Sequence, residues 1–329
     1  IEHTLQDDRF WFFLNGKDNS TNRIEFIFDL MNDEKDIYDN YSTFRFFNKK
    51  FKKNNQETIE ENWKEIKRYF QRFQEWFEER DLYHKIGYLV TVDALNIKEI
   101  YDKSTSLTKK EFRNLLDGEI KNYLKNVSLE NLQYGDKKVK SVLLLYNVLT
   151  MLKNENDNSY FPFDIFKKEK WDIEHITSVA EAIPSKKLEW LKDAGVFIDN
   201  TTQDGVGLKE EIDDFDSDSD EDFEELFSRI VSHFNYHLKD NDINDISNLS
   251  LLDSETNRGY KNAVFPIKRK TIIEREKNGT FVPICTKNVF LKYFSSYPPK
   301  ISFWTQEDRD NYYADLEAVL GDYIVKRDV

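Results

Sequence analysis

The chain has 329 residues, with 48 Lys and Arg against 62 Asp and Glu, so its formal net charge is −14. With 33% charged residues, ten Gly and six Pro, the composition indicates a helix-rich soluble globule and excludes disorder over the whole length. The length suggests two domains or one large elaborated domain. No apolar run approaches the ~20 residues that span a bilayer, so we expect no membrane partner.

A single cysteine, Cys285, excludes a disulfide framework and a zinc site built from paired CxxC knuckles. We therefore expect a cytoplasmic protein. The sequence opens at Ile1 without a Met, a signal peptide or a transit peptide, which suggests a fragment of a longer polypeptide. The acidic total argues against a general nucleic-acid coat, although it says nothing about where the charge lies.

The first half of the sequence shows helical periodicity. Apolar residues over 23–31 recur at helical spacing, and after a plausible cap at Thr58 a longer stripe continues to about Arg80. Its members are Ile59, Trp63, Ile66, Phe70, Phe73 and Phe77. Further helices are predicted over 109–124 and over 139–151, the latter apolar nearly all round. We expect an α-helical domain over residues 1–155 with no catalytic constellation.

Charge is segregated along the second half, which we expect to form another domain over residues 156–329. Helical patterns occur around 185–193 and 222–237, and residues 210–225 between them hold eleven acids and no base. We interpret this run as a solvated or disordered part of a long acidic insertion at about 180–240. Residues 257–292 hold nine bases and two acids, which indicates either a nucleic-acid contact or a helix with a soluble face. Thr305 is expected to cap a final helix.

The motif around His175 carries the clearest chemical signal. Glu174 precedes His175 in an extended context, and Asn248, an apolar strand and Asn257 follow downstream. This order resembles the HNH (ββα-metal) nuclease finger. The resemblance implies that His175 is the general base, that Glu174 and Asn257 bind a divalent metal, and that Asn248 braces the loop. Such chemistry needs a base active near neutral pH and a hard cation on oxygen ligands.

The flanking sequence extends the resemblance. Phe161-Pro162-Phe163 and residues 171–176 form one block, and residues 248–269 form a second. Both are similar to the HNH domain of GmrSD-type modification-dependent (type IV) restriction enzymes, and residues 23–26 and 83–89 are similar to the tail of the partner domain that precedes it. The expected fold is then mainly α with a small ββα-metal element, in the α+β class.

This resemblance implies a Mg²⁺- or Mn²⁺-dependent endonuclease that restricts foreign, modified phage DNA. It also implies a separate NTP-binding domain as a partner, and a homo-oligomer remains an open alternative. The residues expected to contact DNA are Arg258, Lys261, Lys268, Arg269 and Lys270.

Three departures from the family pattern keep other interpretations open. The sequence after the base is Ile176-Thr177-Ser178, without the usual proline. Glu174 replaces the commoner Asp, which leaves Asp172 as a rival metal ligand, and a long insertion separates His175 from Asn248. The alternative function is a catalytically degenerate module that binds DNA or a partner. His175 taken alone would more often be a structural histidine, as we expect for His84.

Overall fold

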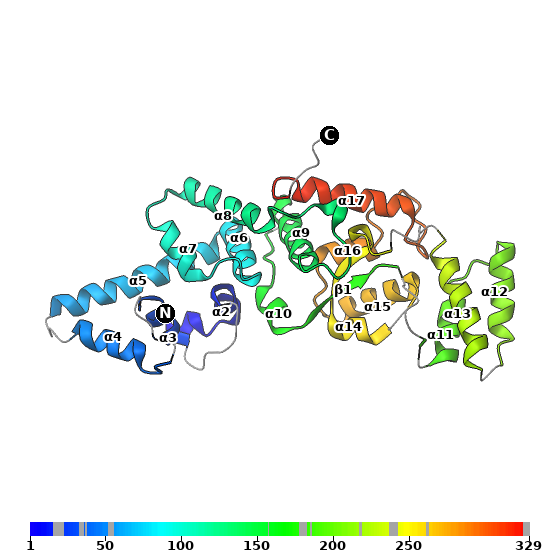
Figure 1. Cartoon of the computed structure of the whole chain (residues 1–329), viewed down its shortest axis with the longest axis horizontal. Helices are drawn as coiled ribbons and strands as arrows, with labels where there is room; N and C mark the ends of the chain where they lie inside the picture. Colours follow the sequence, from blue (N-terminus) through cyan, green and yellow to red (C-terminus); the bar gives the residue numbers. More distant parts are fainter. Residues whose placement is uncertain are drawn as a thin grey trace. The chain divides into compact units, whose positions relative to one another are not determined.

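The computed structural model describes residues 1–15, 23–32, 36, 38–51, 56–156, 158–177, 183–184, 186–216, 219–236, 243–260 and 263–324. Across these residues it is mostly helical, with one two-stranded antiparallel sheet (Figure 1). The predicted α-dominant α+β class is therefore confirmed. In the same residues, no helix is both long enough and apolar enough to cross a membrane.

The chain divides into two compact units. Unit 1 comprises Ile1–Leu124 with Met151–Lys168, and unit 2 comprises Lys125–Thr150 with Glu169–Val329. This division does not coincide with the predicted boundary at residue 155. Tyr83 and His84 of unit 1 hold the segment around Phe161, while Asn147 accepts a hydrogen bond from the backbone N–H of Cys285 within unit 2.

Unit 1 contains short and long helices packed through aromatic side chains. They are α1 (Glu2–Leu5), α2 (Asp8–Leu14), α3 (Arg23–Leu30), α4 (Ser42–Phe51), α5 (Gln56–Glu78), α6 (Arg80–Thr91), α7 (Ile97–Ser104), α8 (Lys109–Leu124) and α10 (Phe163–Lys168). On the predicted stripe of α5, Ile66 and Phe73 are buried, whereas Ile59 and Trp63 are about half exposed. The N-terminal part of this apolar stripe is therefore exposed to solvent, and its later part packs in the core.

His84 is a structural histidine, as expected. Its Nε2 accepts the backbone N–H of Phe161 at 3.0 Å, and its Nδ1 lies 2.6 Å from the carbonyl oxygen of Arg80. Since Nε2 is the acceptor, the proton is on Nδ1 and is donated to that carbonyl. Both ring nitrogens of this buried side chain are thus used in holding the fold.

Unit 2 contains the sheet and the remaining helices. They are η1 (Leu129–Asn131), α9 (Val139–Lys153, whose last residues fall in unit 1), β1 (Trp171–His175), α11 (Lys187–Gly195), α12 (Gln203–Asp213), α13 (Asp220–Phe234), η3 (Ile246–Asn248), β2 (Leu249–Asp253), α14 (Ser254–Tyr260), α15 (Phe265–Lys277), α16 (Ile284–Phe290) and α17 (Gln306–Leu320). Helix α14 contacts both strands, and α16 contacts β2.

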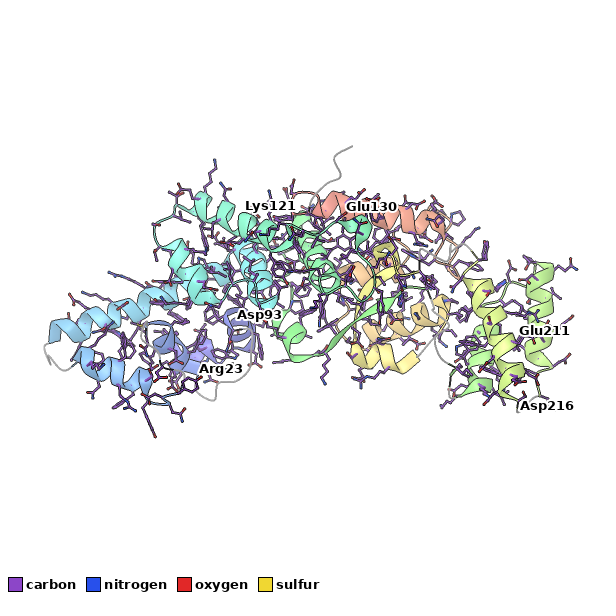
Figure 2. The ribbon with its side chains drawn as sticks, viewed as in Figure 1. Arg23, Asp93, Lys121, Glu130, Glu211 and Asp216 are labelled. Atoms are coloured by element: carbon purple, nitrogen blue, oxygen red, sulfur yellow. The ribbon has the colours of Figure 1, made fainter. Side chains whose placement is uncertain are left out.

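The described part of the acidic run is largely helical, so of the two interpretations, solvated or disordered, the disordered one was wrong, whereas its acids are exposed to solvent. Helices α11, α12 and α13 enclose a core that includes Trp190, Leu208, Phe223, Phe227 and Ile230. The acids are on the outside, as Glu211 on α12 and Asp216 just beyond it illustrate (Figure 2). Amphipathic burial overcomes the repulsion among these carboxylates because the apolar residues recur at helical spacing.

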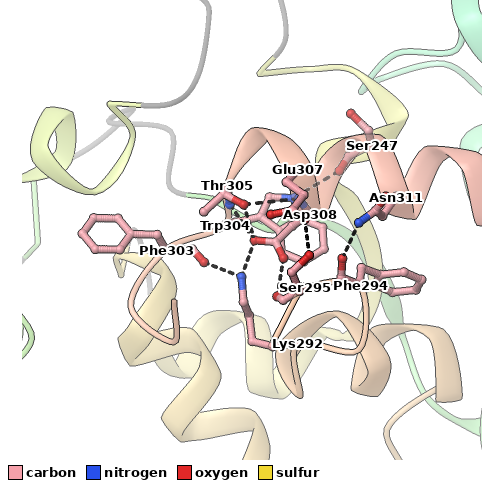
Figure 3. A network of polar contacts seen from close by, with 11 residues as sticks. Ser247, Lys292, Phe294, Ser295, Phe303, Trp304, Thr305, Glu307, Asp308 and Asn311 are labelled. Atoms are coloured by element: carbon pink, nitrogen blue, oxygen red, sulfur yellow. Dashed lines mark hydrogen bonds and ion pairs between the residues drawn. The ribbon is translucent and has the colours of Figure 1, made fainter. Parts of the chain in front are cut away.

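Buried charge anchors the start of α17. Thr305 caps this helix in a capping box with Asp308, which confirms the prediction for Thr305. Asp308 also forms an ion pair with Lys292, and both side chains are almost completely buried. Ser295 donates to the same carboxylate, and Lys292 donates to the carbonyl of Phe303 at 2.6 Å (Figure 3). Burial lowers the pKa of Lys292, and the Asp308 carboxylate opposes that shift.

Candidate functional site

The two strands bring the two halves of the motif together. Trp171 pairs with Asp253 at one end of the antiparallel ladder, and His175 pairs with Leu249 at the other. Since side chains alternate along a strand, Asp172 and Glu174 share one face of the sheet. His175 lies on the opposite face. Helix α14 follows β2 directly, so a strand–connection–strand–helix order surrounds the motif.

Asn248 joins the segment after His175 to the segment before β2. Its side-chain oxygen accepts hydrogen bonds from the backbone N–H of Thr177 at 3.1 Å and from the Thr177 hydroxyl at 3.0 Å. Its side-chain amide donates to the carbonyl of Ile243 at 2.8 Å, and its own carbonyl accepts from the N–H of Ile176. Asn248 is fully buried. These contacts are those that a residue bracing the loop after His175 would make.

The imidazole of His175 is held by a ring and an amide. The ring centroid of Tyr134 lies 4.3 Å from that of His175, and Asn244 Oδ1 lies 3.0 Å from His175 Nε2. When Nε2 donates its proton to this oxygen, the lone pair of the neutral ring is on Nδ1. The backbone N–H of Tyr134 donates to the carbonyl of Asn244 at 2.8 Å, which ties these two neighbours to each other.

Glu174 forms a buried ion pair with Lys268 of α15. Lys268 Nζ lies 2.6 Å from Glu174 Oε1, and their side chains are only 4% and 11% exposed. The same ammonium donates to the carbonyl oxygen of His175 at 2.6 Å. Lys268 thus fixes both residues of the Glu-His pair, and the charge of the predicted metal ligand Glu174 is already compensated.

Asn257 of α14 contacts Asp172 instead of Glu174. Asn257 Nδ2 lies 3.2 Å from Asp172 Oδ2. Asp172 also interacts electrostatically with Lys140 of α9. Burial lowers the pKa of Lys140, and the Asp172 carboxylate opposes that shift only in part. Asp172, the rival of Glu174 in the sequence analysis, is therefore the carboxylate that Asn257 contacts on this face.

Asp172 and Asn257 carry side-chain oxygens, the ligand type that a hard divalent cation takes. Mg²⁺ commonly binds one or two carboxylates and retains several waters, with substrate phosphate completing its shell. Asp172 offers a carboxylate, and rotation of the Asn257 amide would present a carbonyl oxygen beside it. In the part of the chain that the structure describes, no group of three or more His, Cys, Asp and Glu side chains could hold a metal, so protein ligands alone do not complete a cage.

The five predicted DNA contacts are in different environments. Lys268 is buried in its ion pair and is not on the surface. Arg258 is exposed and donates from Nε to the carbonyl of Ser254 at 2.9 Å. Arg269 is half-buried and Lys270 is exposed on α15, whereas Lys261 lies outside the described residues.

Sequence reasoning missed Tyr134 and Asn244 as neighbours of His175. Asn244 lies shortly before Asn248, so its proximity follows from strand pairing. Tyr134 precedes α9 and reaches the site through an isolated bridge between Gln133 and Asp245. No local pattern in the sequence marks that long-range pairing.

His233 and His237 lie four residues apart, a spacing that places two side chains on one helical face. His233 Nδ1 lies 2.8 Å from Asp204 Oδ2 within the insertion, and His237 falls outside the described residues. No protein-family model matches the chain, and no curated protein or solved structure matches it significantly.

Proposed function

We propose that unit 2 is a metal-dependent DNA endonuclease of the HNH type, with His175 at its centre. The observation that carries the proposal is the brace: Asn248 bonds the residues directly after His175 and stands at the start of β2. The β1–β2–α14 order and the Asp172–Asn257 contact support it.

The roles follow from the surroundings of each side chain. His175 is the general base: Asn244 orients its ring, and the lone pair on Nδ1 takes a proton from the attacking water. Lys268 fixes the carbonyl of the base residue itself, and Asn248 fixes the backbone of the two residues directly after it. Asp172 and Asn257 are the residues that would hold Mg²⁺ or Mn²⁺. When bound, the cation neutralises negative charge that develops on the phosphate.

The resemblance to GmrSD-type enzymes extends this proposal to a biological role. The substrate would be foreign DNA, with modified phage DNA the case that such enzymes restrict. The partner would be an NTP-binding domain, either on the same polypeptide or separate. The sequence motifs around His175 and Asn257, together with the contacts of Asn248, support this assignment.

The direct test is cleavage of plasmid and of modified phage DNA in Mg²⁺ or Mn²⁺. Loss of a general base lowers the rate roughly 10²–10⁴-fold, so His175→Ala should lose cleavage while circular dichroism and DNA binding stay unchanged. The matched control is His233→Ala, because His233 pairs with Asp204 inside the insertion. Cleavage by His175→Ala at the rate of the unmodified protein would refute the assignment.

Two observations favour a second candidate, a degenerate module that binds DNA without cutting it. Glu174 is neutralised by Lys268. Asp172 and His175 point to opposite faces, and they lie three positions apart along the extended strand, about 10 Å. This candidate predicts salt-dependent DNA binding by the unmodified protein and no cleavage with either cation at any concentration.

A further inference from the structure

Helix α15 has two faces of different character. Lys268 and Arg275 point toward β1, β2 and α14, where they pair with Glu174 and Asp253. The other face lines a pocket of about 270 Å³. Its α15 residues recur at helical spacing, and Phe197 and Ile301 close its sides. The lining residues from α15 are Pro266, Arg269, Lys270, Ile273, Glu274 and Lys277.

The pocket has an excess of uncompensated positive charge. Among the described residues, Arg269, Lys270 and Lys277 form no ion pair, and Glu274 is the one acid of the lining. The Arg269 Nε atom is buried with no hydrogen-bond partner in that same set. More than about 90% of buried polar groups in native proteins are hydrogen-bonded, so this N–H calls for an acceptor.

The electrostatic surroundings of Arg269 favour an anion as that acceptor. Arg269 is half-buried, and this partial desolvation lowers the pKa of its guanidinium. The Arg269 guanidinium also lies close enough to the Lys292 ammonium to lower the pKa of Lys292. Guanidinium groups form short, charge-assisted and often bidentate hydrogen bonds with phosphate oxygens.

The walls of the pocket are apolar. Phe197, Pro266, Ile273 and Ile301 supply side chains with no charge, and Ile301 is 52% exposed. A bare inorganic anion would leave this surface unused, whereas a nucleotide combines a phosphate with a flat, weakly polar base. We infer that this pocket binds a nucleotide, with its phosphate at Arg269 and its base against the apolar wall.

This inference goes beyond the proposed function because it requires neither His175 nor a divalent cation. The pocket is on the face of α15 away from Lys268 and Glu174. Its ligand would therefore be distinct from the scissile phosphate. The nucleotide could come from a DNA strand that extends past the hairpin or from the free pool, and the experiment distinguishes these sources.

The test is equilibrium binding of a fluorescein-labelled oligonucleotide to the full chain in EDTA, followed by anisotropy, with dAMP and inorganic phosphate as competitors. Arg269→Met retains the apolar stem and should weaken oligonucleotide binding at least about tenfold. The slope of log K against log salt concentration should also become smaller in magnitude by about one. Ile301→Asp places a negative charge at an exposed part of the wall and should weaken binding without unfolding the protein. The control is Lys192→Met, since Lys192 is exposed on α11.

The outcomes separate cleanly. Competition by dAMP supports a free nucleotide, and oligonucleotide binding that resists dAMP supports a nucleotide within a strand. Equal competition by inorganic phosphate and dAMP would overturn the nucleotide assignment. Unchanged oligonucleotide and dAMP binding by both Arg269→Met and Ile301→Asp would overturn the site itself, whatever the cleavage assay gives.

Discussion

The Glu174–Lys268 ion pair allows a direct test of how much Lys268 stabilises the Glu174-His175 segment. Lys268→Met preserves the length and the apolar stem of the side chain but removes the ammonium. The carboxylate of Glu174, 11% exposed, then remains buried without its counter-ion. The carbonyl of His175 also loses its 2.6 Å hydrogen bond from Lys268.

The expected loss is large because both charges are desolvated. Removing one partner of a buried pair costs about 3–5 kcal/mol. For a domain of the size of unit 2, 1 kcal/mol lowers the melting temperature by roughly 2–4 °C, so Lys268→Met should melt about 6–20 °C lower. The double variant Glu174→Leu/Lys268→Met leaves no unpaired charge and should recover most of that loss, since apolar replacements of buried ion pairs are often neutral or stabilising.

Thermal and urea unfolding of the unmodified protein, both single variants and the double variant complete a double-mutant cycle at pH 7. The coupling free energy should exceed about 1 kcal/mol, as is common for residues in contact. A loss below about 1 kcal/mol in Lys268→Met, or losses that simply add in the double variant, would refute the reasoning that this pair is buried and coupled.

Two further predictions concern unit 1. In Gly87→Ala the new Cβ would lie 2.6 Å from Cδ2 of Phe163, so overpacking of about 1–3 kcal/mol should exceed the gain of about 1 kcal/mol in helix propensity. Gly118→Ala, where a Cβ meets nothing within 4 Å, should instead stabilise the protein. Urea midpoints that shift in the same direction for both variants would contradict this prediction. Burial lowers the pKa of Lys167 from near 10.5 to about 7, so the unfolded state binds the extra proton and stability should rise by a few kcal/mol from pH 7 to pH 10. Urea unfolding at several pH values should show this rise in the unmodified protein and lack it in Lys167→Met.

Local patterns predicted the elements of the fold well where one face had to be buried. The capping box of Thr305 and Asp308 was readable because both residues lie within one turn. The predicted helices over 109–124 and 139–151 coincide with α8 and nearly with α9. The stripe around Trp63 was predicted to form a helix to about Arg80, and α5 ends at Glu78. The backbone leaves the helical region at Glu79, which is the N-cap residue of α6.

The acidic run shows how composition can mislead. Eleven acids suggested a solvated or disordered linker, yet α12 extends into this run to Asp213 and α13 begins within it at Asp220. The helical pattern predicted around 222–237, with Phe223, Phe227 and Ile230 buried, coincides with α13.

The candidate site was predictable only in part. The resemblance to HNH enzymes named Asn248, and this residue does bond to Thr177. The partner of Glu174 was not predictable, because Lys268 was grouped with surface bases and only the packing of α15 against β1 reveals its burial. Asp172 faces Asn257 for a similar reason: the position of α14 decides which carboxylate its side chains reach.

The core of α11–α13 bears on how the chain tolerates so long an excursion between paired strands. A slack loop over residues 176–248 would impose a closure entropy that grows by about 0.6 kcal/mol for each doubling of its length. In this chain α11, α12 and α13 pack on a core that also includes Val264 beside α15, so fewer residues between β1 and β2 must be closed as a free loop. The excursion between the two strands therefore costs the hairpin less closure entropy than its length alone would suggest.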